Sequence, residues 1–227
     1  YGTTHEDLEL VALKNHSNSR LNPLAHFNHK EVSREMIKNA QVIASPLTLF
    51  DCSPISDGAA AVIISNNKKS DRDVRIIGSS LFTDHISLSH RKVHTSLEAA
   101  RLASKQAYEQ AEITPKDLDI VEVHDCFTIN ELVAMEDLGI CKPGESKDWV
   151  REERTTLKGE VPINTDGGLK ADGHPIGATG LAQVFEVTTQ LRGEAGDRQV
   201  EGAEIGLTHN IGGVGGTAVI HIFERRG

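Results

Sequence analysis

Four consecutive residues, His124-Asp125-Cys126-Phe127, place an imidazole, a carboxyl and a thiol between a predicted strand and a predicted helix. Alternating residues 120–123 predict the strand, and the apolar run 129–138, stopped by Gly139, predicts the helix. Unpaired N–H groups at the start of a helix favour anions and lower the pKa of a thiol. We therefore expect thiolate character at Cys126, with a buried structural cysteine as the alternative.

Two further segments place a histidine among glycines, Gly173-His174-Pro175-Ile176-Gly177 and His209-Asn210-Ile211-Gly212-Gly213. A single histidine of this kind is usually structural. Three of them together with a cysteine, all at the edges of predicted elements, exceed what a core usually carries. The residue types and their placement therefore predict a functional site.

The overall composition excludes several classes of protein. The 227 residues suffice for one or two domains, and 24 Lys and Arg against 33 Asp and Glu leave a net charge of −9 without a basic stripe, which disfavours nucleic acid. No apolar run approaches the roughly 20 residues of a membrane span, and no signal-peptide pattern opens the chain. Three cysteines, an odd number, favour a reducing compartment, so we expect a cytoplasmic protein.

A metal site is not expected from the histidines and cysteines. The sequence has no Cys-x-x-Cys pair, and His85, His90 and His94 lie in a polar stretch rich in Ser and Thr that predicts a solvated loop.

The pattern of elements changes near residue 73. Residues 1–73 open on Thr3-Thr4-His5-Glu6, a capping-box pattern for a helix, and hold a second predicted helix at 33–40. The polar segment 66–71 is typical of a linker. Residues 74–227 then alternate strands and helices, which predicts a layered α/β domain.

Two features of the second region are specific. Residues 97–111 predict an amphipathic helix with an alanine face suited to close packing on a sheet, begun by the capping box Thr95-Ser96-Leu97-Glu98. Residues 205–207 and 218–222 flank a glycine-rich turn and predict an antiparallel strand pair.

Together these motifs resemble the thiolase superfamily. Asn164-Thr165-Asp166-Gly167-Gly168-Leu169-Lys170-Ala171-Asp172-Gly173-His174-Pro175-Ile176-Gly177-Ala178-Thr179-Gly180 is similar to the family's Gly-His-Pro signature, and Asp57-Gly58-Ala59-Ala60-Ala61-Val62 resembles the strand that closes its N-terminal half. Most thiolases have Asn-Glu-Ala-Phe and Cys-x-Gly where this chain has His124-Asp125-Cys126-Phe127 and Asn210-Ile211-Gly212. Both replacements are similar to the sterol-carrier-protein type of thiolase and its bacterial and archaeal relatives.

The resemblance implies a thiolase-like layered α/β/α sandwich, with the C-terminal half (74–227) and the last part of the N-terminal half (1–73). In the family a preceding half holds a Cys-x-Ser nucleophile, whereas Cys52, Cys126 and Cys141 stand in other contexts. We therefore expect the C-terminal portion of a thiolase, truncated, cleaved or separately encoded. Its missing half would act in cis or in trans, and a homo-oligomer would form through that half.

The activity implied is that of an acyl-CoA:acetyl-CoA C-acyltransferase, which catalyses reversible Claisen condensation or thiolytic cleavage of 3-oxoacyl-CoA. The partners implied are acyl-CoA and acetyl-CoA, with no further cofactor and no metal. By resemblance, His174 activates the nucleophilic cysteine and donates to the thioester carbonyl, and Cys126 is the acid and base. His124 donates to the enolate oxygen, and the Gly212 N–H forms the second oxyanion hole.

Four other residues receive supporting roles from the same resemblance. Asn210 and His209 are expected to hold their turn by side-chain hydrogen bonds. Ser53 matches a serine near the pantetheine arm of CoA, and Phe127 is expected to form a wall of the thioester pocket.

Two alternatives stay open. One is a thiolase-fold retro-aldolase that cleaves an acyl-CoA side chain without a covalent intermediate, although such relatives usually have tyrosine in place of this His/Cys pair. The other is a non-catalytic subunit that scaffolds another chain or binds lipid, which the intact turns disfavour. A metallohydrolase is disfavoured by the spacing of the candidate ligands.

Overall fold

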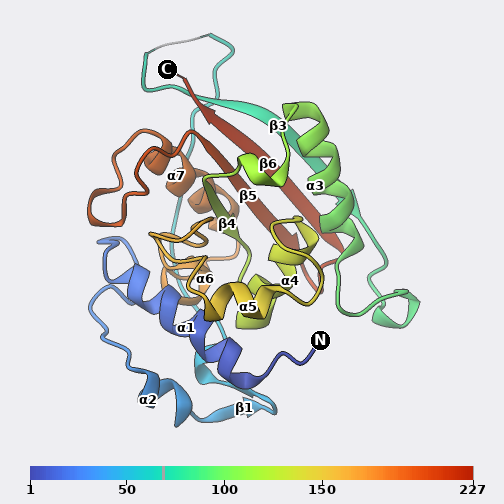
Figure 1. Cartoon of the computed structure of the whole chain (residues 1–227). Coiled ribbons are helices and arrows are strands. Elements are labelled where there is room, and N and C mark those ends of the chain that lie inside the picture. Colours follow the sequence, from blue (N-terminus) through green and yellow to red (C-terminus); the bar gives the residue numbers. More distant parts are fainter. Residues whose placement is uncertain (68–69, 227) are drawn as a thin grey trace.

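A four-stranded sheet forms the centre of the computed structural model, which describes residues 1–67 and 70–226 (Figure 1). The strand order is β3-β6-β5-β4, with β4 parallel to β5 and the other neighbours antiparallel. The strands are β3 (Val74–Thr83), β4 (Ile120–Val123), β5 (Ile205–Gly212) and β6 (Thr217–Arg225). The β5–β6 pair confirms the predicted strands around the glycine turn.

Helices cover both faces of this sheet. On one face α3 (Glu98–Ala111) packs on β3 and β6, with α4 (Thr128–Asp137) beside it. On the other face α7 (Thr179–Leu191) packs on β4, β5 and β6. Strand alternation explains the two cores: Val121 and Val123 belong to the α3–α4 side, and Ile120 belongs to the α7 side. These layers confirm the predicted α/β/α sandwich.

The alanine face of α3 is buried as predicted, at Ala100, Ala103 and Ala107. It allows very close packing, because a β-carbon at Gly78 on β3 would lie 2.5 Å from the Ala107 carbonyl oxygen. The predicted capping box of α3 is wrong. Instead Asp137 of α4 accepts from Ser96 Oγ at 2.5 Å and from the Leu97 N–H at 2.7 Å, since α4 brings a carboxylate to that helix start.

Residues 1–52 contain two helices, a short strand pair and a 3-10 turn, and they lie outside the central sheet. Helix α1 begins one residue later than its capping-box pattern suggested, with Thr4 and Asp7 as the reciprocal pair. It packs against α4, α5 and α6. The remaining elements are α1 (His5–Ser19), α2 (Arg34–Lys38), β1 (Val42–Ala44), β2 (Leu47–Thr48), α5 (Ser146–Arg151), α6 (Gly168–Ala171) and the 3-10 turns Leu49–Asp51, Leu88–His90, Pro115–Asp117 and Gly196–Arg198.

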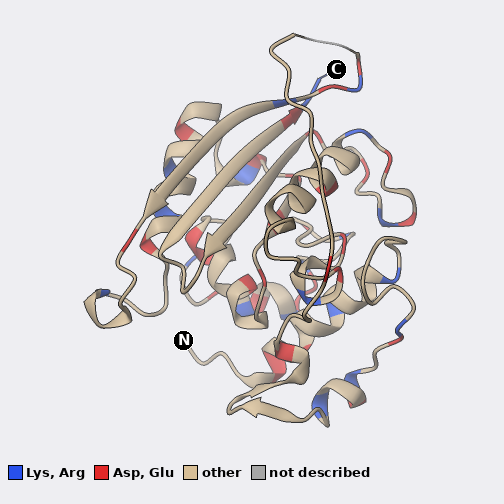
Figure 2. Cartoon of the chain, turned by 180° about the vertical axis from the view of Figure 1, so that it is seen from behind, with Lys and Arg blue, Asp and Glu red and all other residues tan. Residues whose placement is uncertain are grey.

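The strand expected at residues 57–62 is absent from the described structure. Residues 53–65 are extended without strand pairing, and Ile55 and Ile63 are 100% and 99% exposed. Figure 2 shows this segment as part of a long uncoiled trace up the back of the molecule. A strand needs a neighbour for its N–H and C=O groups, and no described strand lies beside this segment. Of the polar segment 66–71, residues 68–69 lie outside the described residues, and the division at residue 73 stays a prediction.

None of the helices within residues 1–67 and 70–226 has both the length and the apolar composition of a membrane span. The same residues contain no group of three or more His, Cys, Asp or Glu side chains placed to hold a metal ion. His85, His90 and His94 are exposed in the loop between β3 and α3, as expected.

Candidate active site

Parallel pairing of β4 and β5 brings two of the predicted turns to one edge of the sheet. Val123 lies beside His209 in the register, so the segment that starts at His124 leaves the sheet beside the last residues of β5. The His124 N–H donates to His209 Nδ1 at 3.5 Å. Two motifs that are 85 residues apart in the sequence thus form one structural unit.

The Asn210 side chain and the His209 backbone attach this unit to helix α7. Both residues lie within β5. Asn210 Nδ2 donates to Gln183 Oε1 on α7 at 3.1 Å, and Gln183 Nε2 donates back to the His209 carbonyl at 3.1 Å. Strand alternation turns the Asn210 side chain toward α7, so it attaches β5 to that helix, and the His209 side chain accepts from the His124 N–H instead of bonding within residues 209–213.

The third turn, residues 173–177, leads directly into α7 and places His174 against His124. The two rings are perpendicular, with centroids 5.0 Å apart. His174 is half-buried, and its Nδ1 lies 2.7 Å from Thr179 Oγ1. The structure therefore brings together the two histidines to which the sequence assigned chemistry.

Burial keeps all three histidines neutral at physiological pH. It lowers the pKa of His124 to about 3, with smaller contributions from His174 and His209, and it lowers the pKa of His209 to about 4. The pKa of His174 is also lowered by burial. A neutral imidazole offers one donor and one acceptor. His124 Nδ1 and His209 Nε2 are buried without a hydrogen-bond partner, so each ring keeps one unused polar atom at the site.

The Cys126 thiol contradicts the expected thiolate character. Burial raises its pKa to about 11, and the neighbouring Asp125 carboxylate adds to the effect. Asn130 Nδ2, which donates to Sγ at 3.0 Å, opposes the shift without reversing it. Burial and a nearby negative charge thus outweigh the helix N-terminus, and the resting form is a thiol.

Ser53 and Phe127 lie next to this thiol. The Ser53 N–H donates to the Cys126 carbonyl at 3.0 Å, and Cys52 forms an isolated antiparallel bridge with Phe127. The Phe127 side chain is 39% exposed and so is available to a ligand. Gly212 lies in the open at the end of β5, where a β-carbon would meet only Thr217 at 3.6 Å. The protein itself therefore does not require glycine there.

The sequence did not reveal the buried hydrogen bonds that hold the segment His124-Asp125-Cys126-Phe127 in place. Asp125 is fully buried, and its carboxylate accepts from the Leu169 N–H and from Asn15 Nδ2, each at 2.7 Å. Burial and the Glu131 charge raise its pKa to about 7. Any β-carbon on Gly168 would lie 2.6 Å from Asp125 Oδ2, so only glycine fits there. In the sequence, the pair Gly167-Gly168 was the feature that could have indicated this close approach.

Asn15 extends this support to a second carboxylate. It donates to Glu131 Oε2 at 3.0 Å, and Glu131 also pairs with Lys14 Nζ at 2.9 Å. Helix α1 thereby holds both Asp125 and the first turns of α4.

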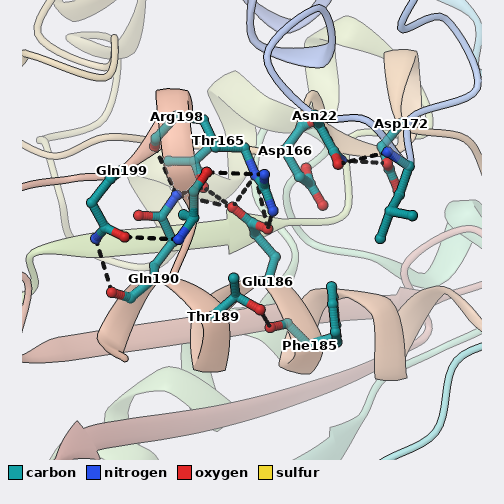
Figure 3. Close-up of polar contacts among 12 residues, drawn as sticks. Asn22, Thr165, Asp166, Asp172, Phe185, Glu186, Thr189, Gln190, Arg198 and Gln199 are labelled. Carbon is teal, nitrogen blue, oxygen red and sulfur yellow. Dashed lines mark hydrogen bonds and ion pairs between the residues drawn. The ribbon is translucent and has the colours of Figure 1, made fainter. Parts of the chain in front are cut away.

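A second group of acids, three buried and one half-buried, lies on the α7 side of the sheet (Figure 3). We define the carboxylate cluster as Glu122, Asp166, Asp172 and Glu186. Thr165 donates its N–H and hydroxyl to Glu122 Oε1 at 2.8 and 3.0 Å, and Arg198 forms a forked pair with Glu186, with Nη2 2.8 Å from Oε2.

Several carboxyl groups can lie this close together because some of them stay protonated. Burial, followed by neighbouring carboxylates, raises the pKa of Asp166 to about 7 and of Asp172 to about 8, and holds that of Glu122 well above its usual range. Asn22 Nδ2 donates to Asp172 Oδ1 at 2.8 Å. A cavity of about 370 Å³ adjoins the cluster, with Pro175 and Phe185 among its walls.

Known proteins resemble this chain in both sequence and fold. The family described as "Thiolase C-terminal domain-like" covers residues 80–225. The chain belongs to this family. Its thiolase relatives include the acetyl-CoA acetyltransferases of Methanothermobacter thermautotrophicus (51% identical over 229 residues) and Methanocaldococcus jannaschii (45% over 235), each covering 99% of this chain. Sterol carrier protein 2 of Bos taurus is 39% identical over 233 residues, again 99% of this chain.

The thiolase-family chain spans only part of these relatives. It covers 60% of each archaeal protein and 42% of the bovine one. Among solved structures, an Ltp2-ChsH2(DUF35) aldolase superposes with a TM-score of 0.84 at 24% identity, covering 100% of this chain and 60% of that one. Human mitochondrial 3-ketoacyl-CoA thiolase gives 0.66 at 17%, covering 97% and 55%. At these identities the structures establish the shared fold.

Proposed function

We propose that this chain supplies the acid–base and oxyanion-binding part of an acyl-CoA:acetyl-CoA C-acyltransferase. The supporting observation is that the rings of His124 and His174 pack perpendicular to each other, with their centroids 5.0 Å apart. Cys126, which is half-buried, follows His124 by two residues in the sequence. The relatives' names supply the reaction class, namely acyl transfer between coenzyme A thioesters.

In the first half-reaction, a cysteine outside this chain attacks the acyl thioester. His174 accepts the thiol proton, since its ring is neutral. The departing CoA thiolate takes a proton from Cys126, for which a thiol pKa of about 11 is suitable because the proton is present at neutral pH.

In the second half-reaction, the Cys126 thiolate formed in this way removes the α-proton of acetyl-CoA. His124 donates to the enolate oxygen, while the Gly212 N–H stabilises the oxyanion of the acyl thioester under attack. When the new carbon–carbon bond has formed, the nucleophilic cysteine leaves as a thiolate and regains its proton from His174. Protons and electrons balance over the cycle, and Cys126 ends as a thiol.

We propose that the nucleophile lies in the part of the longer relatives that this chain does not match. Cys52 directs its Sγ to the Thr48 carbonyl at 3.5 Å, and the buried Cys141 lies in the loop after α4. Burial raises the pKa of both thiols, to about 12 at Cys141, so neither has the character of an activated nucleophile.

The test is to assay cleavage of acetoacetyl-CoA by this chain alone and by the chain fused to the nucleophile-containing portion of an archaeal relative. We expect no turnover alone and turnover in the fusion. Turnover by the isolated chain at the rate of the fusion would contradict the proposal.

The same fusion discriminates the two alternatives. A thiolase forms an acyl-enzyme from acetyl-CoA, which raises the mass of the protein by one acetyl group. A retro-aldolase would break a carbon–carbon bond without that adduct, and a non-catalytic subunit would do neither.

A further inference from the structure

The hydroxyl of Thr179 makes two contacts that together fix a proton. Thr179 is the first residue of α7 and is buried. Its Oγ1 lies 2.7 Å from His174 Nδ1 and 3.1 Å from the Pro175 carbonyl oxygen. Both contacts are within hydrogen-bond range.

Only one assignment of protons makes both contacts favourable. A hydroxyl has one proton to donate and two lone pairs. The Pro175 carbonyl can only accept, so the hydroxyl donates to it. His174 Nδ1 must then carry a proton and donate it to the Oγ1 lone pair. In the reverse arrangement, two acceptor oxygens would face each other at 3.1 Å.

We infer that Thr179 is a positioning residue that holds the neutral His174 ring as its Nδ1–H tautomer and leaves the Nε2 lone pair free to accept a proton. The tautomer follows from the contacts alone, whereas its use, the removal of a proton from the nucleophilic thiol, rests on the proposed function. A free neutral imidazole prefers the Nε2–H form, which would present a donor where the reaction needs an acceptor.

Helix geometry makes Thr179 suitable for this task. Thr179 lies four residues after Pro175, the spacing at which a threonine side chain in a helix bonds back to a carbonyl. Its own N–H also donates to the Pro175 carbonyl at 3.0 Å. Branching at the β-carbon restricts the side chain to few rotamers. The hydroxyl is therefore held in place before any substrate arrives.

The tautomer can be measured directly on this chain. Protein labelled with 15N-histidine gives two-bond 1H–15N correlations that distinguish the two neutral forms, and loss of signals in His174→Gln assigns the ring. We expect Nδ1–H at His174 in the wild type and in Thr179→Ser, and a shift to Nε2–H in Thr179→Val. Wild-type His174 in the Nε2–H form would overturn the inference, even if Thr179→Val does not fold.

A matched control is available on the same helix. Thr189 makes the same backward bond, to the Phe185 carbonyl at 2.7 Å (Figure 3), but it is only half-buried and its hydroxyl forms no hydrogen bond to a described histidine. Thr189→Val should leave the His174 spectrum unchanged. An equal change in both variants would mean that the helix, and not the Thr179 hydroxyl, sets the tautomer, and the inference would fail.

Kinetics of the fusion add the functional readout. We expect Thr179→Val to slow acyl-enzyme formation by more than about tenfold with KM for acetyl-CoA unchanged, within the ceiling of about 10⁴-fold found when a catalytic histidine has the wrong tautomer. Thr179→Ser should recover most of the rate. If the tautomer changes as expected while the wild-type fusion forms no acyl-enzyme, the tautomer assignment stands and the proposed function fails.

Discussion

We define the site edge as His124, Cys126, His174 and His209. The site edge and the carboxylate cluster both take residues from β4 or α7 and their flanking segments, but they use polar groups in opposite ways. His124 and Glu122 are two residues apart around the end of β4, and Thr179 and Glu186 are seven apart on one face of α7. At the site edge, His124 Nδ1 and His209 Nε2 are buried without partners. In the cluster, Glu186 has a forked guanidinium pair and Glu122 accepts two bonds from Thr165.

This difference indicates that the site edge serves the reaction, whereas the carboxylate cluster stabilises the fold around it. A buried polar atom without a hydrogen-bond partner costs free energy, so such atoms are found where a ligand or a reacting group supplies the missing hydrogen bond. A fully paired network fixes the backbone that carries the site, in this case the loop 164–173 that ends at His174. Changes at the site edge should therefore alter rate more than stability, and changes in the cluster should do the reverse.

The largest expected effect on rate is at Cys126. In the fusion, Cys126→Ala should lower condensation and α-proton exchange by about 10²–10⁴-fold, the usual contribution of one acid–base group. Acylation of the nucleophile, followed by mass, should persist. Cys141→Ala and Cys52→Ala are the controls and should retain the wild-type rate per folded molecule. Loss of activity at Cys141 in place of Cys126 would refute the assignment.

The two histidines should divide the reaction between them. His124→Ala should lower condensation by about 10²–10³-fold, as expected for one lost oxyanion donor, and leave acyl-enzyme formation intact. His174→Ala should suppress both steps. His124→Asn should recover part of the rate, because an amide also donates.

Unfolding midpoints provide the control for this pair. If His124 only supported the start of α4, both His124 variants would lose stability at unchanged rate per folded molecule. An inactive His124→Ala with a wild-type midpoint would instead favour the catalytic role.

Within the carboxylate cluster, the largest expected effect is on stability. Arg198 and Glu186 have side chains 7% and 2% exposed, so Arg198→Leu leaves a buried charge unpaired. We expect the free energy of unfolding to fall by about 3–5 kcal/mol, with an unchanged rate per folded molecule. The exposed Arg101–Glu98 pair is the control, and Arg101→Leu should cost no more than about 1 kcal/mol. Equal effects of the two variants would contradict the distinction.

The sequence predicted best what depends on local pattern. The turn at residues 173–177, the α3 alanine face and the β5–β6 pair are all readable within a few residues of each position. The resemblance supplied the roles at His124, Cys126 and His174, which remain predictions, while the structure shows that the two histidines meet.

The failures share a different cause, because each depends on a partner far along the chain. Residues 57–62 have strand-like composition but no described neighbour to pair with. The α3 cap comes from Asp137, and Asp125 is held by Asn15, which is 110 residues away. The pKa of Cys126 is set by burial, which local sequence at a helix start does not reveal.

The smallest expected effect tests the charge state of the cluster through pH. The Asp172 carboxyl has a pKa of about 8 in the folded chain against an ordinary value of 3.8. As pH rises above about 4 the unfolded chain loses this proton first, so the wild type loses stability until the folded form also ionises near pH 8. Asp172→Asn removes this titration and keeps an oxygen to accept from Asn22.

The free energy of unfolding of Asp172→Asn minus that of the wild type should therefore increase between pH 4 and pH 8 and level off above. Its slope cannot exceed about 1.4 kcal/mol per pH unit for a single proton. Urea unfolding at pH 5, 7 and 9 measures the trend, and contributions from Asp166 and Glu122 cancel to the extent that both proteins share them. Asp197→Asn, on an exposed turn beyond α7, is the control and should give a flat difference. A flat difference at Asp172 as well would mean that its carboxyl is ionised in the fold, and that the cluster, unlike the neutral histidines of the site edge, carries this charge throughout the pH range.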